Sequence, residues 1–268
     1  MGRVIAVANQ KGGVGKTTTT LNLAACIAAA ERPVLVIDAD PQANLTSGLG
    51  CRTAETRPSL YDVLIGAESL ESIVIDTELQ HLKLAPADRN LTGAEIELVT
   101  AERREYRLAD AVAALRDRFE YIFIDSPPSL GLLTVNALTA ADGVIIPLQC
   151  EYFALEGVSE LMATLKRIQK AMNPRLDVDG VLFTMVDERV SLTQQVMVDI
   201  RQHFQDKVFG ANIPRNVRLA EAPSFGKPII CYDIRSRGAV AYLELAEELM
   251  QHEAKRAGQG SERPSARS

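Results

Sequence analysis

The sequence lacks the long apolar segment that a membrane-spanning helix requires. No stretch approaches the ~18 to 20 consecutive apolar residues of such a helix, and the chain runs from Met1 directly into the strand-like segment RVIAVA. A signal peptide would instead place a charged region, an apolar region and a cleavage site there. These two absences predict a cytoplasmic protein that does not act in a membrane.

Cysteine is scarce, and its spacing argues against several kinds of site. The chain has four cysteines, which lie far apart and form no C-x-x-C pair. The pattern therefore does not indicate a zinc site, a redox centre or a disulfide framework. We interpret all four as reduced, small core residues: Cys26, Cys51, Cys150 and Cys231.

The sequence also has no overall excess of positive charge and no internal repeat. Its formal net charge is −6, which argues against a protein that is basic over its whole surface. Net charge does not exclude a local basic face, however, because the sign of the potential can differ from one region of a surface to another.

What is present is an alternation of apolar, β-branched runs with helical patterns. Such alternation predicts βαβ units and therefore a doubly wound α/β fold, with a mostly parallel sheet flanked by helices. We expect one domain over residues 1–257, followed by a disordered polar tail over residues 258–268, where no apolar side chain is larger than alanine. The first predicted helix spans 16–30, and the predicted strands are VIAVAN, VLVID, LKLAPA, YIFID, GVIIPL and VLFTMV.

A glycine-rich loop follows the first predicted strand and opens the first predicted helix. This is the context of a phosphate-binding loop, in which glycines let backbone N–H groups turn toward a phosphate. Lys16 would neutralise the β- and γ-phosphates, and Thr17 would offer its hydroxyl to Mg²⁺. The alternative is a glycine-rich turn without a ligand. The predicted nucleotide-binding residues of this loop are Lys11, Gly12, Gly13, Val14, Gly15, Lys16, Thr17 and Thr18.

Three acidic residues end two of the predicted strands. Asp38 and Asp40 follow VLVI at a spacing of two, so they point the same way in an extended chain. Asp125 ends YIFID and is expected to hold Mg²⁺ through a water, as a Walker B acid does. Any single one of them could instead be a helix cap or a turn former.

The loop departs from the ordinary pattern in a way that identifies a family. Gln10 stands where the first glycine usually lies, and Lys11 follows it. This KGGxGKTT signature resembles that of the deviant Walker ATPases, also called the ParA/MinD or SIMIBI class of P-loop NTPases, and the likeness extends from residue 3 to about 255. It implies that Lys11 reaches across a nucleotide-sandwich homodimer to the partner's phosphates, and that Lys11, Lys16 and Asp40 are catalytic. The alternative for Lys11 is a solvated loop lysine.

The same resemblance implies roles for the acids and for residues further along the chain. Asp38 would support the metal with Thr17 and Asp125, and Asp40, in its DxDPQ motif, would orient the attacking water. The segments VLFTMVDERVSLTQQV and ANIPRNVRLAEAPSFGKPI are similar to those of chromosomal, Soj-type ParA proteins. By that similarity Met185, Pro214 and Asn216 line the adenine pocket, while Arg189 and Arg218 contact DNA phosphates.

The charge distribution agrees with a local DNA-binding face. From residue 189 to 237 the chain has eight Lys/Arg and four acids, which leaves the remainder at −10. A cationic surface on an acidic protein fits binding to phosphate backbones without base readout. The alternative is that these arginines are ordinary solvated charges or ion pairs.

The resemblance implies a switch driven by ATP and Mg²⁺. The ATP-bound homodimer would bind nonspecific double-stranded DNA, associate with the nucleoid and segregate chromosome or plasmid origin regions with a ParB/Spo0J-type partner, and slow, partner-stimulated hydrolysis would release it. No helix-turn-helix segment precedes residue 3, which favours the short chromosomal or small-plasmid type. The main alternative is a MinD-like, membrane-associated cell-division ATPase, which would need a basic amphipathic C-terminal helix. An amide-forming ligase would need a substrate pocket that the sequence does not identify.

Overall fold

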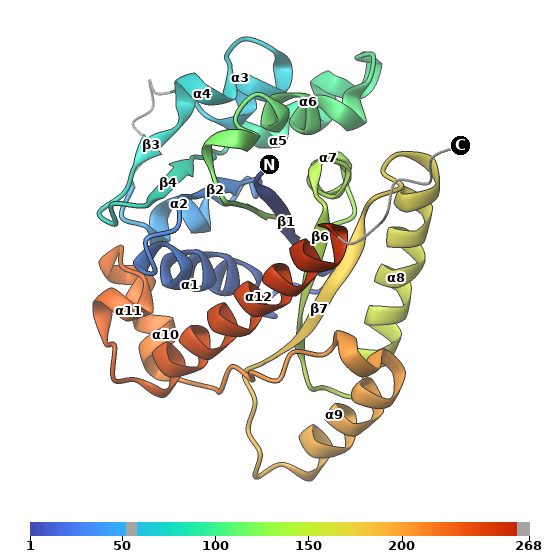
Figure 1. Ribbon diagram of the computed structural model, residues 1–268. Helices are drawn as coiled ribbons and strands as arrows, with labels where there is room; N and C mark the ends of the chain where they lie inside the picture. The colour runs from blue at the N-terminus through green and yellow to red at the C-terminus, as the bar shows by residue number, and fades with distance from the viewer. Residues whose placement is uncertain (52–57, 262–268) are drawn as a thin grey trace.

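The computed structural model describes residues 1–51 and 58–261, and in this part of the chain a seven-stranded sheet forms the centre of the molecule (Figure 1). The strand order is β3-β4-β2-β5-β1-β6-β7. Neighbouring strands are parallel except at the edge, where β3 pairs antiparallel with β4. The predicted doubly wound fold is confirmed. The strands are β1 (Arg3–Val7), β2 (Val34–Asp38), β3 (Ile75–Asp76), β4 (Leu82–Ala85), β5 (Tyr121–Asp125), β6 (Gly143–Gln149) and β7 (Asp177–Thr184).

Helices cover both faces of the sheet (Figure 1). The α-helices are α1 (Lys16–Ala29), α2 (Asn44–Gly48), α3 (Leu60–Ile65), α4 (Leu70–Ile73), α5 (Leu91–Glu97), α6 (Arg107–Ala113), α7 (Leu132–Ala140), α8 (Ala154–Ala171), α9 (Ser191–Phe204), α10 (Val217–Glu221), α11 (Ile229–Tyr232) and α12 (Arg237–Ser261). The short 3-10 helices are η1 (Leu98–Thr100), η2 (Arg104–Tyr106), η3 (Arg116–Arg118), η4 (Gln205–Lys207) and η5 (Ala222–Phe225).

The two helical layers explain why the strands are apolar throughout. Successive side chains of a strand point to opposite faces. In β1, Val4 and Ala6 pack into the core that includes α7 and α8, whereas Ile5 and Val7 pack into the core that includes α1 and α12. All four are fully buried. A strand that is covered on both faces gains from apolar residues at every position, which produces the continuous runs seen in the sequence.

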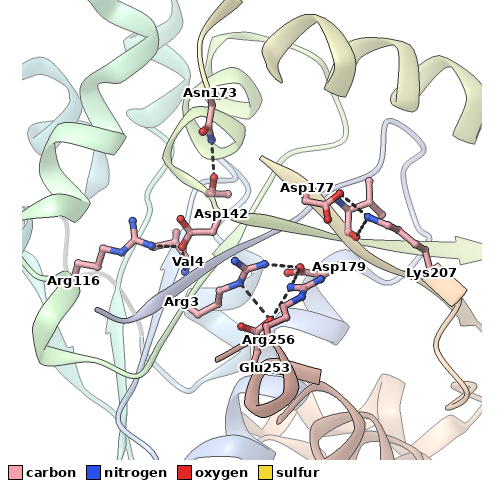
Figure 2. A network of polar contacts seen from close by, with 12 residues as sticks. Arg3, Val4, Arg116, Asp142, Asn173, Asp177, Asp179, Lys207, Glu253 and Arg256 are labelled. Atoms are coloured by element: carbon pink, nitrogen blue, oxygen red, sulfur yellow. Dashed lines mark hydrogen bonds and ion pairs between the residues drawn. The ribbon is translucent and has the colours of Figure 1, made fainter. Parts of the chain in front are cut away.

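Strand β7 begins earlier than its apolar run predicts, because its first residues pair with Gly143 and Val144 of β6. Asp179 lies within the strand with its side chain only 1% exposed, and its Oδ1 accepts hydrogen bonds from Arg3 at 2.6 Å and Arg256 at 2.5 Å. Figure 2 shows these contacts beside the Arg116–Asp142 ion pair. The network connects β1, β7 and the last helix at the amino end of the sheet.

Replacing Asp179 with alanine should therefore destabilise the protein by about 1 to 3 kcal/mol, because two partly buried guanidinium groups lose their shared carboxylate. The measurement is the free energy of unfolding in urea. Asp177→Ala is the matched control, since Asp177 is 57% exposed and pairs with Lys207 at the surface, so its loss should change the free energy by less than about 1 kcal/mol. Equal effects of the two substitutions would contradict this role for Asp179.

Two expectations need correction. Helix α12 continues to Ser261, so residues 258–261 are helical rather than part of a disordered tail; an existing helix can be extended without a new nucleation step. Residues 262–268 of the predicted tail lie outside the described residues. Cys26 and Cys150 are buried as expected, whereas Cys51 is half-buried and Cys231 is exposed, so not all four cysteines are core residues.

The described part of the chain contains no helix that is both long enough and apolar enough to cross a membrane.

Candidate nucleotide site

The glycine-rich loop joins β1 to α1, as its position in the sequence predicts. Gly13 and Gly15 have φ values of 75° and 89°, a left-handed conformation in which a side chain would be strained. Lys16 extends back over the loop, and its Nζ donates to the carbonyl of Lys11 at 3.2 Å. No side chain caps the N-terminus of α1. Its first N–H groups and its positive dipole end are therefore available to an anion.

A cavity of about 290 Å³ lies in front of this loop. A second cavity of about 430 Å³ shares three of its lining residues, Thr17, Thr18 and Asn44. The first cavity is lined by Gly12, Gly13, Gly15, Lys16, Thr17, Thr18, Asp40, Gln42, Asn44, Pro128 and Met185. The fold thus brings most of the predicted phosphate-loop residues together with one of the predicted acids.

Val14 does not line this cavity. It is buried, and its carbonyl accepts a hydrogen bond from the Thr184 hydroxyl at 2.8 Å. Asn9, which sequence reasoning missed, donates to the carbonyl of Pro147 and accepts from the backbone N–H of Lys11. These contacts fix the two ends of the loop to the carboxyl ends of β6 and β7.

Asp38 and Asp125 lie side by side at the ends of β2 and β5, where they are register partners. Both are fully buried. Asp125 accepts hydrogen bonds from the hydroxyls of Thr17 at 2.7 Å and Thr20 at 3.2 Å. Asp38 accepts from the N–H and hydroxyl of Thr46 and from the N–H of Asp40. Its carboxylate therefore positions Asp40 and helix α2, whereas Asp125 positions Thr17.

Burial and mutual repulsion shift the titration of these groups. Burial raises the pKa of Asp38 to about 6. The pKa of Asp125 is raised to about 8, chiefly by burial and also by the neighbouring charge of Asp38, although the hydrogen bond from Thr17 opposes this shift. Burial also lowers the pKa of Lys16, although Asp125 and Asp40 oppose this. A divalent cation placed nearby would favour the ionised carboxylates.

The donors beside the loop fit Mg²⁺. No group of three or more His, Cys, Asp or Glu side chains gathers around a possible metal position in the described ranges. Mg²⁺, however, is commonly held by one or two protein oxygens together with phosphate oxygens and waters. The Thr17 hydroxyl and the Asp125 carboxylate behind it would supply the protein oxygens.

Asp40 is placed differently from the other two acids. Its side chain is buried but borders the cavity. One carboxylate oxygen accepts from the N–H of Gln42 at 2.9 Å, and the other has no hydrogen-bond partner among the described residues. A fixed carboxylate with one free oxygen is suited to accept a proton from, or to orient, a water molecule in the cavity.

Lys11 lies outside the cavity and forms an ion pair with Glu151, which follows β6. The two side chains are 52% and 46% exposed. An exposed ion pair contributes only about 0 to 1 kcal/mol. Lys11 can therefore leave Glu151 readily for another anionic partner.

Of the predicted adenine-pocket residues, only Met185 borders the cavity at the loop. Met185 has a φ of 51°, which is uncommon for a residue with a side chain. Pro214 bridges to Val186 and lines a separate cavity. Asn216 caps α10, where its side-chain oxygen accepts the N–H of Arg218 at 2.8 Å.

Pro223 and Ser224 line the second cavity beside Thr17 and Thr18. Spacing along the chain gives no signal for these two residues, because they lie some two hundred positions from the loop and approach it through the packing of η5 against α2.

The two predicted DNA-binding arginines are exposed, and both have acidic partners. The Arg189 side chain is 88% exposed and makes a two-point contact with Asp187. The Arg218 side chain is 55% exposed and pairs with Glu221 at 2.9 Å and Asp233 at 3.6 Å. To bind a phosphate, each arginine would have to release its acidic partner or contact the phosphate and that partner at the same time.

Comparisons with known proteins agree with the site. A family model described as an AAA domain matches residues 2–178. The chain is 54% identical to the chromosome partitioning protein ParA of Caulobacter vibrioides over 94% of this chain and 95% of that protein. It is 53% identical to the sporulation initiation inhibitor protein Soj of Bacillus subtilis, covering 93% and 98% of the two chains.

A solved structure described as cobyrinic acid a,c-diamide synthase from Mycobacterium smegmatis, with bound ATP analogue and magnesium, superposes with a TM-score of 0.84. It is 38% identical in sequence, and the match covers 96% of this chain and 97% of that one. Identity above 50% over almost the full length, together with the lysine-rich phosphate loop and the Asp40 cavity, shows that this chain belongs to the ParA/Soj family of chromosome-partitioning ATPases.

Proposed function

We propose that this ATPase is a dimeric switch that binds nonspecific double-stranded DNA in its ATP state and is released by hydrolysis. ATP and Mg²⁺ are its cofactors. The observation that carries the proposal is the cavity in which Lys16, Thr17 and Asp40 converge, with Lys11 held at the surface nearby. Such a site can hold a phosphate chain and place a water beside it.

The residues in and beside the cavity have separate roles in the proposed hydrolysis. Lys16 and the α1 N-terminus neutralise the phosphate oxygens. Thr17, positioned by Asp125, would hold Mg²⁺ through its hydroxyl, and the bound metal would supply positive charge beside the phosphate oxygens. Asp40 orients the attacking water. Lys11 leaves Glu151 and adds a positive charge in trans when two copies face each other across the nucleotides.

The switch follows from differential affinity. A γ-phosphate that contacts both subunits favours the dimer, and the dimer doubles the number of cationic groups presented to DNA. Arg189 and Arg218 are the proposed phosphate contacts. We further propose a centromere-binding partner of the ParB/Spo0J type that stimulates turnover, and a role in segregating chromosome or plasmid origin regions at the nucleoid.

The two competing functions have less support. A membrane-associated MinD-like role would need a basic amphipathic C-terminal helix, whereas α12 carries several glutamates, among them Glu244, Glu247 and Glu248. An amide-forming ligase activity would agree with the name of the Mycobacterium smegmatis synthase, which is 38% identical to this chain. The ParA and Soj relatives are more similar to this chain, at 54% and 53% identity.

The proposed function predicts DNA binding that requires ATP. The purified protein with Mg²⁺ should bind a labelled duplex of arbitrary sequence with ATP but not with ADP, and the affinity should fall steeply as salt increases. Arg189→Glu combined with Arg218→Glu should weaken this binding at least about tenfold, because each dimer would exchange four phosphate contacts for four repulsive charges. Fluorescence anisotropy over a salt series provides the measurement.

The matched control is Arg175→Glu, which changes an exposed arginine at the start of β7, at the other end of that strand from the nucleotide site. It should bind DNA as the unmodified protein does. If the unmodified protein bound DNA equally with ATP and ADP, or bound none with either, the proposed switch would be wrong.

A further inference from the structure

We propose that Arg215, Arg235 and Arg237 form, with Arg189, an arginine-lined groove that holds the phosphate backbone of a DNA duplex. This inference rests on the proposed function, and it assigns much of the DNA contact to residues outside the pair indicated by resemblance. We refer to these four residues as the arginine groove.

The groove is the largest of the cavities described here, with a volume of about 770 Å³. Three segments that lie far apart in the sequence form its walls. The loop after β7 contributes Arg189, the extended segment before α10 contributes Arg215, and the turn that leads into α12 and the first residue of that helix contribute Arg235 and Arg237. Bridging of Val186 to Pro214 holds the first two segments together.

The three added arginines differ from Arg189 and Arg218 in their pairing. Arg189 and Arg218 form ion pairs with acidic residues. Arg215, Arg235 and Arg237 are exposed, and none has a carboxylate within 4.0 Å among the residues placed by the structure. A phosphate can therefore bind to them without displacing a carboxylate that is paired within the chain.

The charges of the groove favour an anion overall. Its walls carry four arginines and three acids, Asp187, Glu188 and Glu244, and Asp187 is already engaged by Arg189. Neither Glu188 nor Glu244 forms an ion pair with an arginine in the described ranges. The net charge of the walls is therefore +1, and Arg215 also lies near enough to Asp187 to help lower the pKa of that carboxyl.

The location of Arg235 and Arg237 is unfavourable for the stability of α12 itself. A helix N-terminus carries partial positive charge, so acidic residues are favoured there and basic ones are not. The 25-residue α12 nevertheless has no acid in its first turn and begins at Arg237, and Arg235 lies two residues before it. Ser236 caps the helix through the N–H of Ala239 at 3.1 Å. An external anion in the groove would offset the repulsion between the dipole and these arginines.

A DNA backbone is the anion that fits this surface best. The cations of the groove come from three separate segments of the chain. Successive phosphates of a duplex present charges at regular intervals, which arginines on different segments can bind without reading bases. Backbone contacts of this kind give binding without sequence preference.

The test compares three variants in the ATP state, using the anisotropy assay and salt series above. The first is the triple variant Arg215→Ala, Arg235→Ala, Arg237→Ala, which removes six guanidinium groups per dimer. Each phosphate contact contributes about 0.9 to the slope of log affinity against log salt, so the slope should lose about 3 or more in magnitude. The apparent Kd near 0.1 M salt should rise at least about tenfold.

The second variant replaces the same three arginines with lysine and should bind DNA within about threefold of the unmodified protein, because lysine also binds phosphate as a point charge. The third is Arg175→Ala, the matched loss of one exposed arginine at the amino end of β7. It should leave both the affinity and the slope unchanged. Binding of a fluorescent ATP analogue and ATP-dependent dimer mass are measured for every variant.

The outcomes separate this inference from the proposed function. If the unmodified protein binds DNA with ATP and the alanine triple variant keeps the same affinity and slope, the groove is not a DNA site, while the proposed switch stands. If the triple variant loses ATP binding or dimerisation along with DNA binding, these arginines act on the nucleotide state and the inference is also wrong. An unmodified protein that binds no DNA overturns both.

Discussion

Replacing Asp40 with alanine should lower steady-state ATP hydrolysis by about 10²- to 10⁴-fold, the range that a positioned general base contributes. Binding of ATP·Mg²⁺ should change little, because the phosphate-binding loop and the Thr17–Asp125 contact do not involve Asp40. The variant should therefore accumulate as an ATP-bound dimer. Phosphate release, nucleotide binding and mass photometry measure the three properties.

Asp40→Asn distinguishes the charge of this residue from its structural role. An asparagine oxygen can still accept the N–H of Gln42, the contact that holds the turn after β2. The free position, however, would carry an amide, which cannot accept a proton from water. We expect the asparagine variant to be as inactive as the alanine variant. Normal turnover in either one would remove Asp40 from the mechanism.

The second prediction with a large expected effect is that Asp125→Asn raises the stability of the nucleotide-free protein while it lowers ATP binding and hydrolysis. Asp125→Asn should weaken Mg²⁺-dependent ATP binding and hydrolysis, since it removes the carboxylate that positions Thr17 and that would support the metal. In the absence of nucleotide and Mg²⁺, the same substitution should stabilise the protein at pH 8, because it removes a fully buried acid whose ionised form is unfavourable.

The pH dependence gives the sign of this effect. The folded-state pKa of Asp125 is raised to about 8 from an ordinary value of 3.8. The folded state thus favours the protonated acid. The contribution of Asp125 to the free energy of unfolding is therefore fully present below about pH 4 and is lost as pH rises through about 8. Asp38, with a pKa raised to about 6, contributes in the same direction at lower pH.

Urea unfolding between pH 5 and pH 8 tests this expectation. The free energy of unfolding of the unmodified protein should decline over this range relative to that of Asp125→Asn. Asp206→Asn is the control, since Asp206 is exposed in η4 and its side chain forms no hydrogen bond or ion pair with another described residue. If the free energies of unfolding of the unmodified protein and Asp125→Asn changed in parallel with pH, ionisation of the buried Asp125 would not destabilise the folded state.

The phosphate loop could be predicted from sequence because its function depends on local geometry. Gly13 and Gly15 adopt positive φ angles, and Lys16 and Thr17 follow them at fixed positions on the first turn of α1. Backbone conformation and the start of a helix are set by residues a few positions apart. The spacing of Asp38 and Asp40 likewise predicted that both would approach the site.

The division of labour between those two acids could not be predicted in this way. Asp38 is fully buried by contacts with Thr46, whereas Asp40 borders the cavity. Asp38 ends the strand that Asp40 follows two residues later, and the packing of α2 against β2 distinguishes them. The early start of β7 was hidden for a similar reason, because Asp179 looks like a surface residue until Arg3 and Arg256 approach it from other elements.

The sequence by itself determined the parallel α/β fold, the phosphate loop and the family, because apolar periodicity, glycine positions and a contiguous signature are properties of nearby residues. Only the tertiary structure decided which arginines are free and which are paired, that Lys11 lies against Glu151, and that Arg189, Arg215 and Arg235 line one groove. The physical reason is that the Lys11–Glu151 pair and the groove depend on distances between segments separated by tens of residues, which the packing of helices on the sheet sets, whereas the Arg189–Asp187 pair depends on the conformation of one loop.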